Sequence, residues 1–214
     1  QEEKGLINNS MAQTSTTLSG AKSHVENITG TDISLNASGG TYTISSTSTV
    51  LTGNGKLSVR DLVTISGTTN NNSTFTVKAV VSTTEFTVEE IVTTESADGS
   101  TTFTLDHSGF VTDKAKGDGY FSQPDGVHTV AYQVVNLGDS TDDFLGTVKM
   151  QGSLATTPTE DDWFDITGTT LTSDQSTTIA SYNFTGNFVW VRAKVETTNL
   201  TSNPSMITAI LLNN

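Results

Sequence analysis

The chain has 214 residues, of which 33% are hydrophobic, 15% are charged and none is cysteine, and its formal net charge at pH 7 is −13. The lack of cysteine excludes thiolate catalysis, disulfide bonds and cysteine-based zinc sites. With only 10 Lys and Arg residues, the chain is poor in the cations that bind phosphates, so we expect it to bind neither nucleic acid nor anionic membranes. No apolar run approaches the roughly 20 residues of a membrane span.

The N-terminal segment is polar and has no sustained apolar face. Self-docking of such a segment would recover little buried area against the entropy of ordering it. We therefore expect residues 1–40 to form an extended arm that another subunit holds, rather than this chain's own core.

Residues 41–107 predict a first β module, because β-branched runs alternate with turn residues. The module is expected to be a small antiparallel barrel or meander. Its predicted strands are Thr41–Ser45, Leu62–Ser66, Thr74–Val81, Glu85–Glu89 and Thr101–Asp106.

A Gly- and Asp-rich linker is predicted over residues 108–125, and a second β module over residues 126–214. Turns recur there every 8–14 residues or so, which is typical of an antiparallel sandwich, here of jelly-roll type. The predicted strands are Val127–Asn136, Gly146–Gln151, Trp163–Thr167, Thr177–Tyr182, Asn187–Glu196 and Met206–Leu212. The predicted fold class is thus all-β, with two antiparallel modules that follow an arm.

The clearest strand signal lies between Gly186 and Glu196, where side chains alternate over a full strand. One side is apolar and is expected to face the sandwich interior: Val189, Val191, Ala193 and Val195. The other side is amphipathic and is expected to face outward: Phe188, Trp190, Arg192, Lys194 and Glu196. A tryptophan on a solvated face favours a contact with a neighbour.

The aromatic residues of this region give the candidate interface. Trp163 and Trp190 could stack on carbohydrate, but such residues more often pack at a sandwich edge or a subunit contact. We expect Phe188, Trp190, Arg192 and Trp163 to contribute to an interface with another subunit.

No residue pattern predicts catalysis or a resident cofactor. His24, His107 and His128 have no metal-ligand spacing, and there is no nucleophile elbow and no phosphate-binding loop. Two acidic loops could hold Ca²⁺, although solvated loops are the commoner explanation. The loop carboxylates are Asp139, Asp142, Asp143, Glu160, Asp161, Asp162 and Asp165. Asp161 and Asp165 could serve glycoside hydrolysis only at a fixed separation, which the sequence does not determine.

Two stretches resemble structural proteins of tailed bacteriophages, especially marine T4-like phages. The run from Ser181 to Ala193 and the end from Ile207 to Asn214 resemble the ends of such proteins. Leu62–Gly67 with Phe75-Thr76-Val77 resembles small β modules of phage virion proteins. The resemblance covers about two thirds of the chain and transfers no catalytic residue. It implies a non-enzymatic particle component, either a capsid decoration protein or a neck or tail accessory subunit.

The function expected from the sequence is therefore subunit assembly in a virion, after synthesis in the host cytoplasm. The expected partners are other virion proteins, such as major capsid or tail subunits, and further copies of the chain in a homo-oligomer. A receptor- or glycan-binding adhesin that contacts host surface glycan is the first alternative. A hydrolase of cell-surface polymer is the second.

Overall fold

The computed structural model is all-β, with antiparallel sheets and two short 3-10 helices, which confirms the predicted fold class. The structure describes residues 15–53, 55–123, 126–135, 143–173, 178–197 and 207–213. In this part of the chain, no helix has the length and apolar character needed to cross a membrane.

All the strands predicted between residues 41 and 212 are present, with shifted ends, and the structure adds five short strands that the sequence did not indicate. The N-terminal strands are β1 (Ser15–Ser19), β2 (Ile28–Gly30), β3 (Ile33–Ser38), β4 (Thr41–Ser46), β5 (Asp61–Ser66), β6 (Thr74–Ser82), β7 (Glu85–Val88) and β8 (Phe103–Val111). The later elements are β9 (Ala115–Lys116), η1 (Asp118–Phe121), β10 (Val127–Val134), β11 (Gly146–Ser153), η2 (Glu160–Asp162), β12 (Phe164–Asp165), β13 (Leu171–Thr172), β14 (Ile179–Thr185), β15 (Trp190–Thr197) and β16 (Ile207–Asn213).

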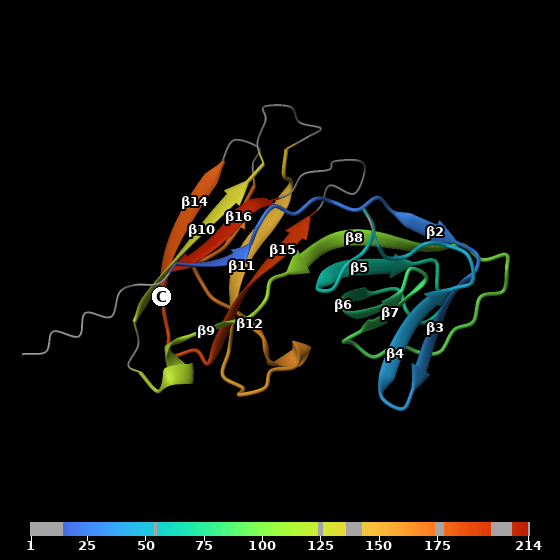
Figure 1. Cartoon of the computed structure of the whole chain (residues 1–214), viewed down its shortest axis with the longest axis horizontal. Coiled ribbons are helices and arrows are strands. Elements are labelled where there is room, and N and C mark those ends of the chain that lie inside the picture. Colours follow the sequence, from blue (N-terminus) through green and yellow to red (C-terminus); the bar gives the residue numbers. More distant parts are fainter. Residues whose placement is uncertain are drawn as a thin grey trace, which may run out of the picture.

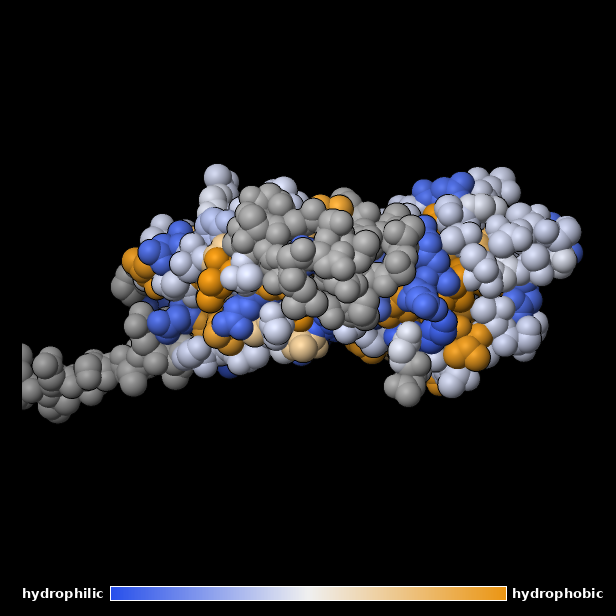
Figure 2. All heavy atoms as spheres, turned by 90° about the horizontal axis from the view of Figure 1, so that it is seen from above, coloured by the Kyte–Doolittle hydropathy of each residue, from blue (hydrophilic) through white to orange (hydrophobic). Residues whose placement is uncertain are grey.

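The strands form two sheets (Figure 1). A four-stranded sheet has the order β1-β16-β10-β14. The other sheet has twelve strands, whose main path runs β12-β11-β15-β8-β5-β6-β7-β4-β3. Seen from above in Figure 2, the molecule is elongated, and apolar residues reach this surface in separate patches between polar ones.

The C-terminal half is a sandwich of the four-stranded sheet on β11 and β15. The two sheets share one apolar core, because alternate residues of each strand point between them. The fully buried members include Val130, Tyr132, Val148, Met150, Val191, Ala193, Val195, Ile210 and Leu212. Of the four predicted inward positions, Val191, Ala193 and Val195 are therefore confirmed, whereas Val189, which precedes β15, is only half-buried.

The N-terminal half has a core of its own, to which strands β2 to β8 contribute. Five of these strands form an antiparallel meander in the order β5-β6-β7-β4-β3. Its core side chains include Ile33, Leu35, Ile44, Leu57, Val63, Ile65, Phe75, Phe86 and Leu105. Within the described residues this sheet stays open, so of the two predicted forms the meander describes it and a closed barrel does not.

Strand β8 belongs to both halves. It pairs with β5 along most of its length, and its end pairs with β15 through Phe110 opposite Val195 and Gly109 opposite Glu196. Gly109 has a φ of +137°, and a Cβ there would collide with the carbonyl oxygen of Val195. This position needs glycine, because the strand crosses between the halves where the two backbones approach closely.

The predicted arm is wrong for the described residues 15–40. Leu18 packs into the C-terminal core, while Val25, Ile28 and Ile33 pack into the N-terminal one. The apolar residues of this segment contact one core for only a few positions before the chain passes to the other core. The sequence therefore shows no sustained apolar face. Residues 1–14 lie outside the described residues.

Residues 108–123 are not a plain connection. They contain the end of β8, the strand β9 paired with β15, and η1. The predicted boundary at residue 108 therefore falls inside a strand. Whether the chain divides there into separate folding units stays a prediction.

Replacement of Gly109 by alanine should destabilise the fold by about 3 kcal/mol. The reason is that the new Cβ meets a backbone oxygen in a conformation that side-chain-bearing residues avoid. Gly20 is the control, because a Cβ there meets no atom within 4 Å. Urea unfolding of both alanine variants measures the difference, and equal stability would contradict the role given to Gly109.

Candidate interaction surface

The outward face of β11 and β15 carries charged residues that are paired within the chain. We call this the charged face and define it by Lys149, Gln151, Trp190, Arg192, Lys194 and Glu196. These side chains share one side of the sheet, because Lys149 lies opposite Lys194 and Gln151 opposite Arg192 in the antiparallel register. The face therefore places three cations on two neighbouring strands.

Arg192 is the centre of this face and is only 5% exposed. Its two terminal nitrogens donate to the carboxylate of Glu160, at 2.8 and 2.6 Å, and Nε donates to Gln151 at 3.0 Å. The guanidinium lies 4.2 Å from the ring centroid of Trp163. These contacts fold the η2 loop back over the sheet, which buries the arginine without leaving its charge unpaired.

The remaining cations are paired in the same way. Lys149 lies 2.8 Å from Asp165 and 3.1 Å from Glu196, and Lys194 lies 2.9 Å from Glu196. Burial alone would raise the pKa of Asp165, but Lys149 and Gln151 hold this pKa below its ordinary value. A general acid needs the opposite shift, so Asp165 does not suit the proton-donating role in glycoside hydrolysis.

Trp190 is half-buried, and its contacts are made within the chain. Its Nε1 donates to the Thr156 carbonyl at 3.0 Å, Lys114 lies 4.5 Å from its ring centroid, and Tyr120 packs edge-on at 4.9 Å. Of the four predicted interface residues, Trp190 and Arg192 thus lie on the charged face, and Trp163 packs against Arg192 from the η2 loop. An interface with another subunit at this face stays a prediction.

Phe188 does not belong to that face, so its predicted outward position is wrong. It is 8% exposed and packs in the C-terminal core against Phe184, Phe164 and His128. The regular alternation begins only at Trp190, where β15 starts. The irregular segment before the strand, residues 186–189, directs Phe188 inward, and its path could not be placed from the alternation alone.

The opposite sheet of the sandwich differs completely in charge. None of the residues in β1, β10, β14 and β16 is Asp, Glu, Lys or Arg. The register places the outward side chains of these strands side by side, and we call them the uncharged face. Its members are Ser15, Thr17, Val127, Thr129, Ala131, Gln133, Ile179, Ser181, Asn183, Thr185, Ala209, Leu211 and Asn213. Such a face is unusual in a chain with a net charge of −13.

A polar cluster is buried where the N-terminal strap, residues 20–27, crosses from one half to the other. Asp61 accepts from Lys22 at 2.8 Å and from the backbone and hydroxyl of Ser58, and it lies 3.6 Å from Nε2 of His107. Burial alone would raise the pKa of Asp61, but His107 and Lys22 hold this pKa below its ordinary value. His107 also accepts from the Val25 amide at 3.0 Å, which anchors the strap.

His24 completes this cluster, with its ring 5.2 Å from that of His107. Two of the three histidines therefore meet, which the sequence did not indicate. Both ring nitrogens of His24 are buried and lack a hydrogen-bond partner within the described residues. Burial, followed by the nearby His107, lowers the pKa of His24 to about 4.

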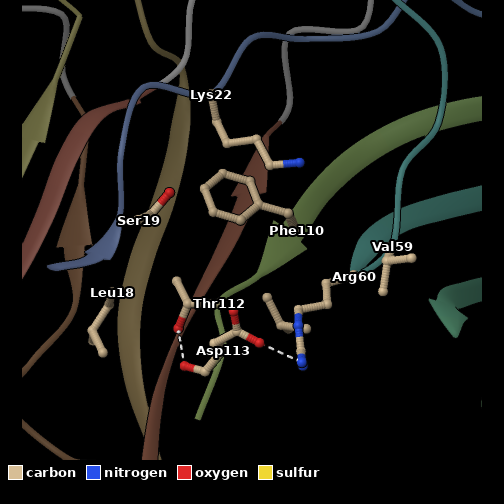
Figure 3. A pocket seen from close by; sticks show the side chains of 9 residues that line it. Leu18, Ser19, Lys22, Val59, Arg60, Phe110, Thr112 and Asp113 are labelled. Atoms are coloured by element: carbon tan, nitrogen blue, oxygen red, sulfur yellow. Dashed lines mark hydrogen bonds and ion pairs between the residues drawn. The ribbon is translucent and has the colours of Figure 1, made fainter. Parts of the chain in front are cut away.

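A groove of about 400 Å³ lies beside the strap (Figure 3). Lys22 extends over the ring of Phe110, and Arg60 forms an ion pair with Asp113. Arg60 has a φ of +74°. Each cation of the groove is already matched by a carboxylate, so the geometry indicates no free anion site.

The described acidic residues do not form a metal site. No group of three or more potential ligands is found among the residues that the structure places. Glu160 and Asp165 are in ion pairs, and Asp162 caps η2 by accepting from Thr159. Asp139 and Asp142 lie outside the described residues, so a Ca²⁺ site in that loop stays a hypothesis.

Comparison with known proteins gives no relatives. No family model, no curated protein and no solved structure matches the chain.

Replacement of Glu160 by alanine should lower the free energy of unfolding by about 1–3 kcal/mol. The buried Arg192 guanidinium would lose both of its carboxylate contacts and remain desolvated. Glu26, which is exposed, supplies the control, and its alanine variant should unfold like the wild type. Chemical denaturation compares the three proteins; a Glu160→Ala protein as stable as the control would contradict the central role of Arg192.

Stability should fall as the pH is lowered from about 6.5 toward 4. In this window His24 is neutral in the folded chain and protonated in the unfolded chain, because folding lowers its pKa from 6.5 to about 4. The unfolded state binds more protons in this window and is therefore favoured, by roughly 1–2 kcal/mol once the solvent screening of a partly exposed ring is allowed for. Urea unfolding between about pH 7 and pH 5 measures the slope. The His24→Gln variant should give a flatter profile, and an unchanged slope would refute the assignment.

Proposed function

We propose that this chain is a non-enzymatic structural component of a bacteriophage virion, a capsid decoration or a neck or tail accessory protein, that acts by subunit assembly. It is made in the host cytoplasm and incorporated with other virion proteins, such as major capsid or tail subunits. The resemblance of its C-terminal strands to phage structural proteins supports a place in a virus particle, and the uncharged face supports assembly with other subunits.

The uncharged face is the observation that carries this proposal. A net charge of −13 makes free copies repel each other and keeps them soluble. A contact between subunits is then favoured where neither surface brings charge into the interface, because buried charges must be desolvated. A whole sheet without Asp, Glu, Lys or Arg supplies such a surface, and the outer strand β14, whose edge is open within the described residues, adds backbone hydrogen-bonding groups.

Glycan binding is a weaker explanation of the aromatic residues. Sugar rings stack on aromatic faces, but cations of this chain already lie over the relevant rings. Arg192 lies over Trp163, Lys114 over Trp190, and Lys116 4.1 Å from the centroid of Tyr120. These contacts leave fewer open ring faces for a host surface glycan. A glycan array with the purified chain separates the two functions, and an assay for polymer depolymerisation separates both from a hydrolase.

Replacement of Ala131 by lysine should reduce incorporation of the chain into virus particles by more than about tenfold. Ala131 lies at the centre of the uncharged face, opposite Ser181 and Leu211, and a charge there would have to be desolvated in an interface. Ala79 is exposed on β6 in the other half, and its lysine variant is the matched control. Quantitative mass spectrometry of particles from the encoding virus measures both.

The wild-type chain should be present in these particles at a symmetric copy number. Absence of the wild-type chain from purified particles would contradict the virion proposal. Equal incorporation of the two lysine variants would contradict the role of the uncharged face. Normal melting temperatures of both variants would show that the fold is intact.

A further inference from the structure

We infer that β14 is a docking edge for a second copy of this chain, in which two β14 strands pair antiparallel about a two-fold axis. The pairing would join two four-stranded sheets into one continuous sheet. This inference rests on the assembly function proposed above and names its partner. The observations that support it concern the backbone edge of β14 and not the side chains of the uncharged face.

The other strand edges in the described part of the chain are short or protected, whereas β14 is neither. β9, β12 and β13 have two residues each. β1 has a register shift that breaks its pairing. The edge of β3 is covered by Glu95, whose backbone exchanges two hydrogen bonds with Leu35, at 2.8 and 2.9 Å. Short edges, bulges and covering segments are the devices by which proteins prevent strand pairing.

Within the described residues, β14 lacks every one of these devices. It has seven residues, Ile179–Thr185, and contains no charge, no proline and no glycine. Its pairing with β10 is regular, since each residue from Ile179 to Thr185 has a consecutive partner. In Figure 1 it lies at the outer side of the four-stranded sheet, beside β10. It is therefore a long, regular and uncharged edge.

The backbone groups that face away from β10 can be identified from the register. The Val134 amide donates to the Thr178 carbonyl at 3.1 Å, and hydrogen-bonded pairs alternate along an antiparallel ladder. Ala180, Tyr182 and Phe184 therefore bond to β10. The alternate residues Ile179, Ser181, Asn183 and Thr185 direct their N–H and C=O groups outward, where no partner lies within the described residues.

A second β14 satisfies all of these groups in one register. When Tyr182 lies opposite Tyr182 of the partner subunit, Ser181 pairs with Asn183 of the partner subunit, and Ile179 pairs with Thr185 of the partner subunit. Every outward group then has a partner, and the strands overlap along their full length. Two identical edges related by a two-fold axis form such a closed, self-complementary contact.

Charge favours a copy over a different partner. A chain with a net charge of −13 pairs with its own copy only where acidic residues do not meet. β14 and its neighbour β10 contain no Asp, Glu, Lys or Arg, and His128 of β10 is buried in the core, so the continuous sheet would bring no like charges together. A cationic partner would instead be recognised by an acidic edge, which β14 is not.

The register gives a test by sedimentation velocity at about 0.15 M salt, where long-range repulsion is screened. The wild type should dimerise with rising concentration. The variant Ser181→Lys/Asn183→Lys places lysine opposite lysine across the two-fold axis and should weaken the dimer by roughly tenfold or more. The variant Ser181→Lys/Asn183→Glu places opposite charges together and should remain within a few-fold of the wild type. Ser66→Lys/Ser100→Lys, at exposed sites in the other half, controls for net charge.

Cross-linking gives a readout that does not depend on added charge. The chain contains no cysteine, and paired strands hold opposite Cα atoms at about 5.5 Å, within reach of a disulfide. Oxidation of the Ser181→Cys/Asn183→Cys variant should therefore give covalent dimers, and Ser66→Cys/Ser100→Cys should not.

Two results would overturn the inference: a wild type that stays monomeric up to about 1 mM, or equal weakening by the Lys/Lys and Lys/Glu variants. Incorporation of the chain into particles without dimerisation would overturn this inference alone. Dimers of a chain that is absent from particles would instead overturn the proposed function and leave the strand pairing intact.

Discussion

The pairing of β8 with both β5 and β15 is the constraint on which the rest of the structure depends. Strand β8 contributes Leu105 to the N-terminal core and Phe110 to the C-terminal core. A single strand therefore connects the two cores. The close crossing at Gly109 makes this possible, because a side chain would separate the strands. The strap from β1 to β2 then lies over the junction, and the cluster of Lys22, Asp61 and His107 anchors it there.

The two outer surfaces of the C-terminal sandwich differ in charge. On the charged face, Arg192 and Lys149 are matched by carboxylates of the same chain, so the face is satisfied without a partner. On the uncharged face, no charge needs a match, and its polar side chains and the β14 backbone edge present hydrogen-bonding groups. A surface whose charges are already paired within the chain gains less binding free energy from docking. The uncharged face is therefore a better candidate interface than the charged face around Trp190.

Local pattern was sufficient to predict the strands from β4 onward except the two-residue strands β9 and β13, because side chains of a half-buried strand alternate between core and solvent. It also identified Val191, Ala193 and Val195 as core residues. It failed for Phe188, which precedes the strand and turns inward, and for residues 15–38, whose short strands belong to two different cores. The meeting of His24 and His107, 83 positions apart in the numbering of the chain, had no sequence signal at all.

The sequence by itself determined the fold class, the absence of cysteine chemistry and the acidic charge, because composition and alternation are local properties of the polypeptide. It also contained the uncharged strands, each visible as a polar or apolar run without Asp, Glu, Lys or Arg. Only the tertiary structure decided that β1, β10, β14 and β16 lie in one sheet, and that β14 stands at its edge. Strand order depends on long-range pairing, and the free energy of each pairing depends on residues far apart in the chain.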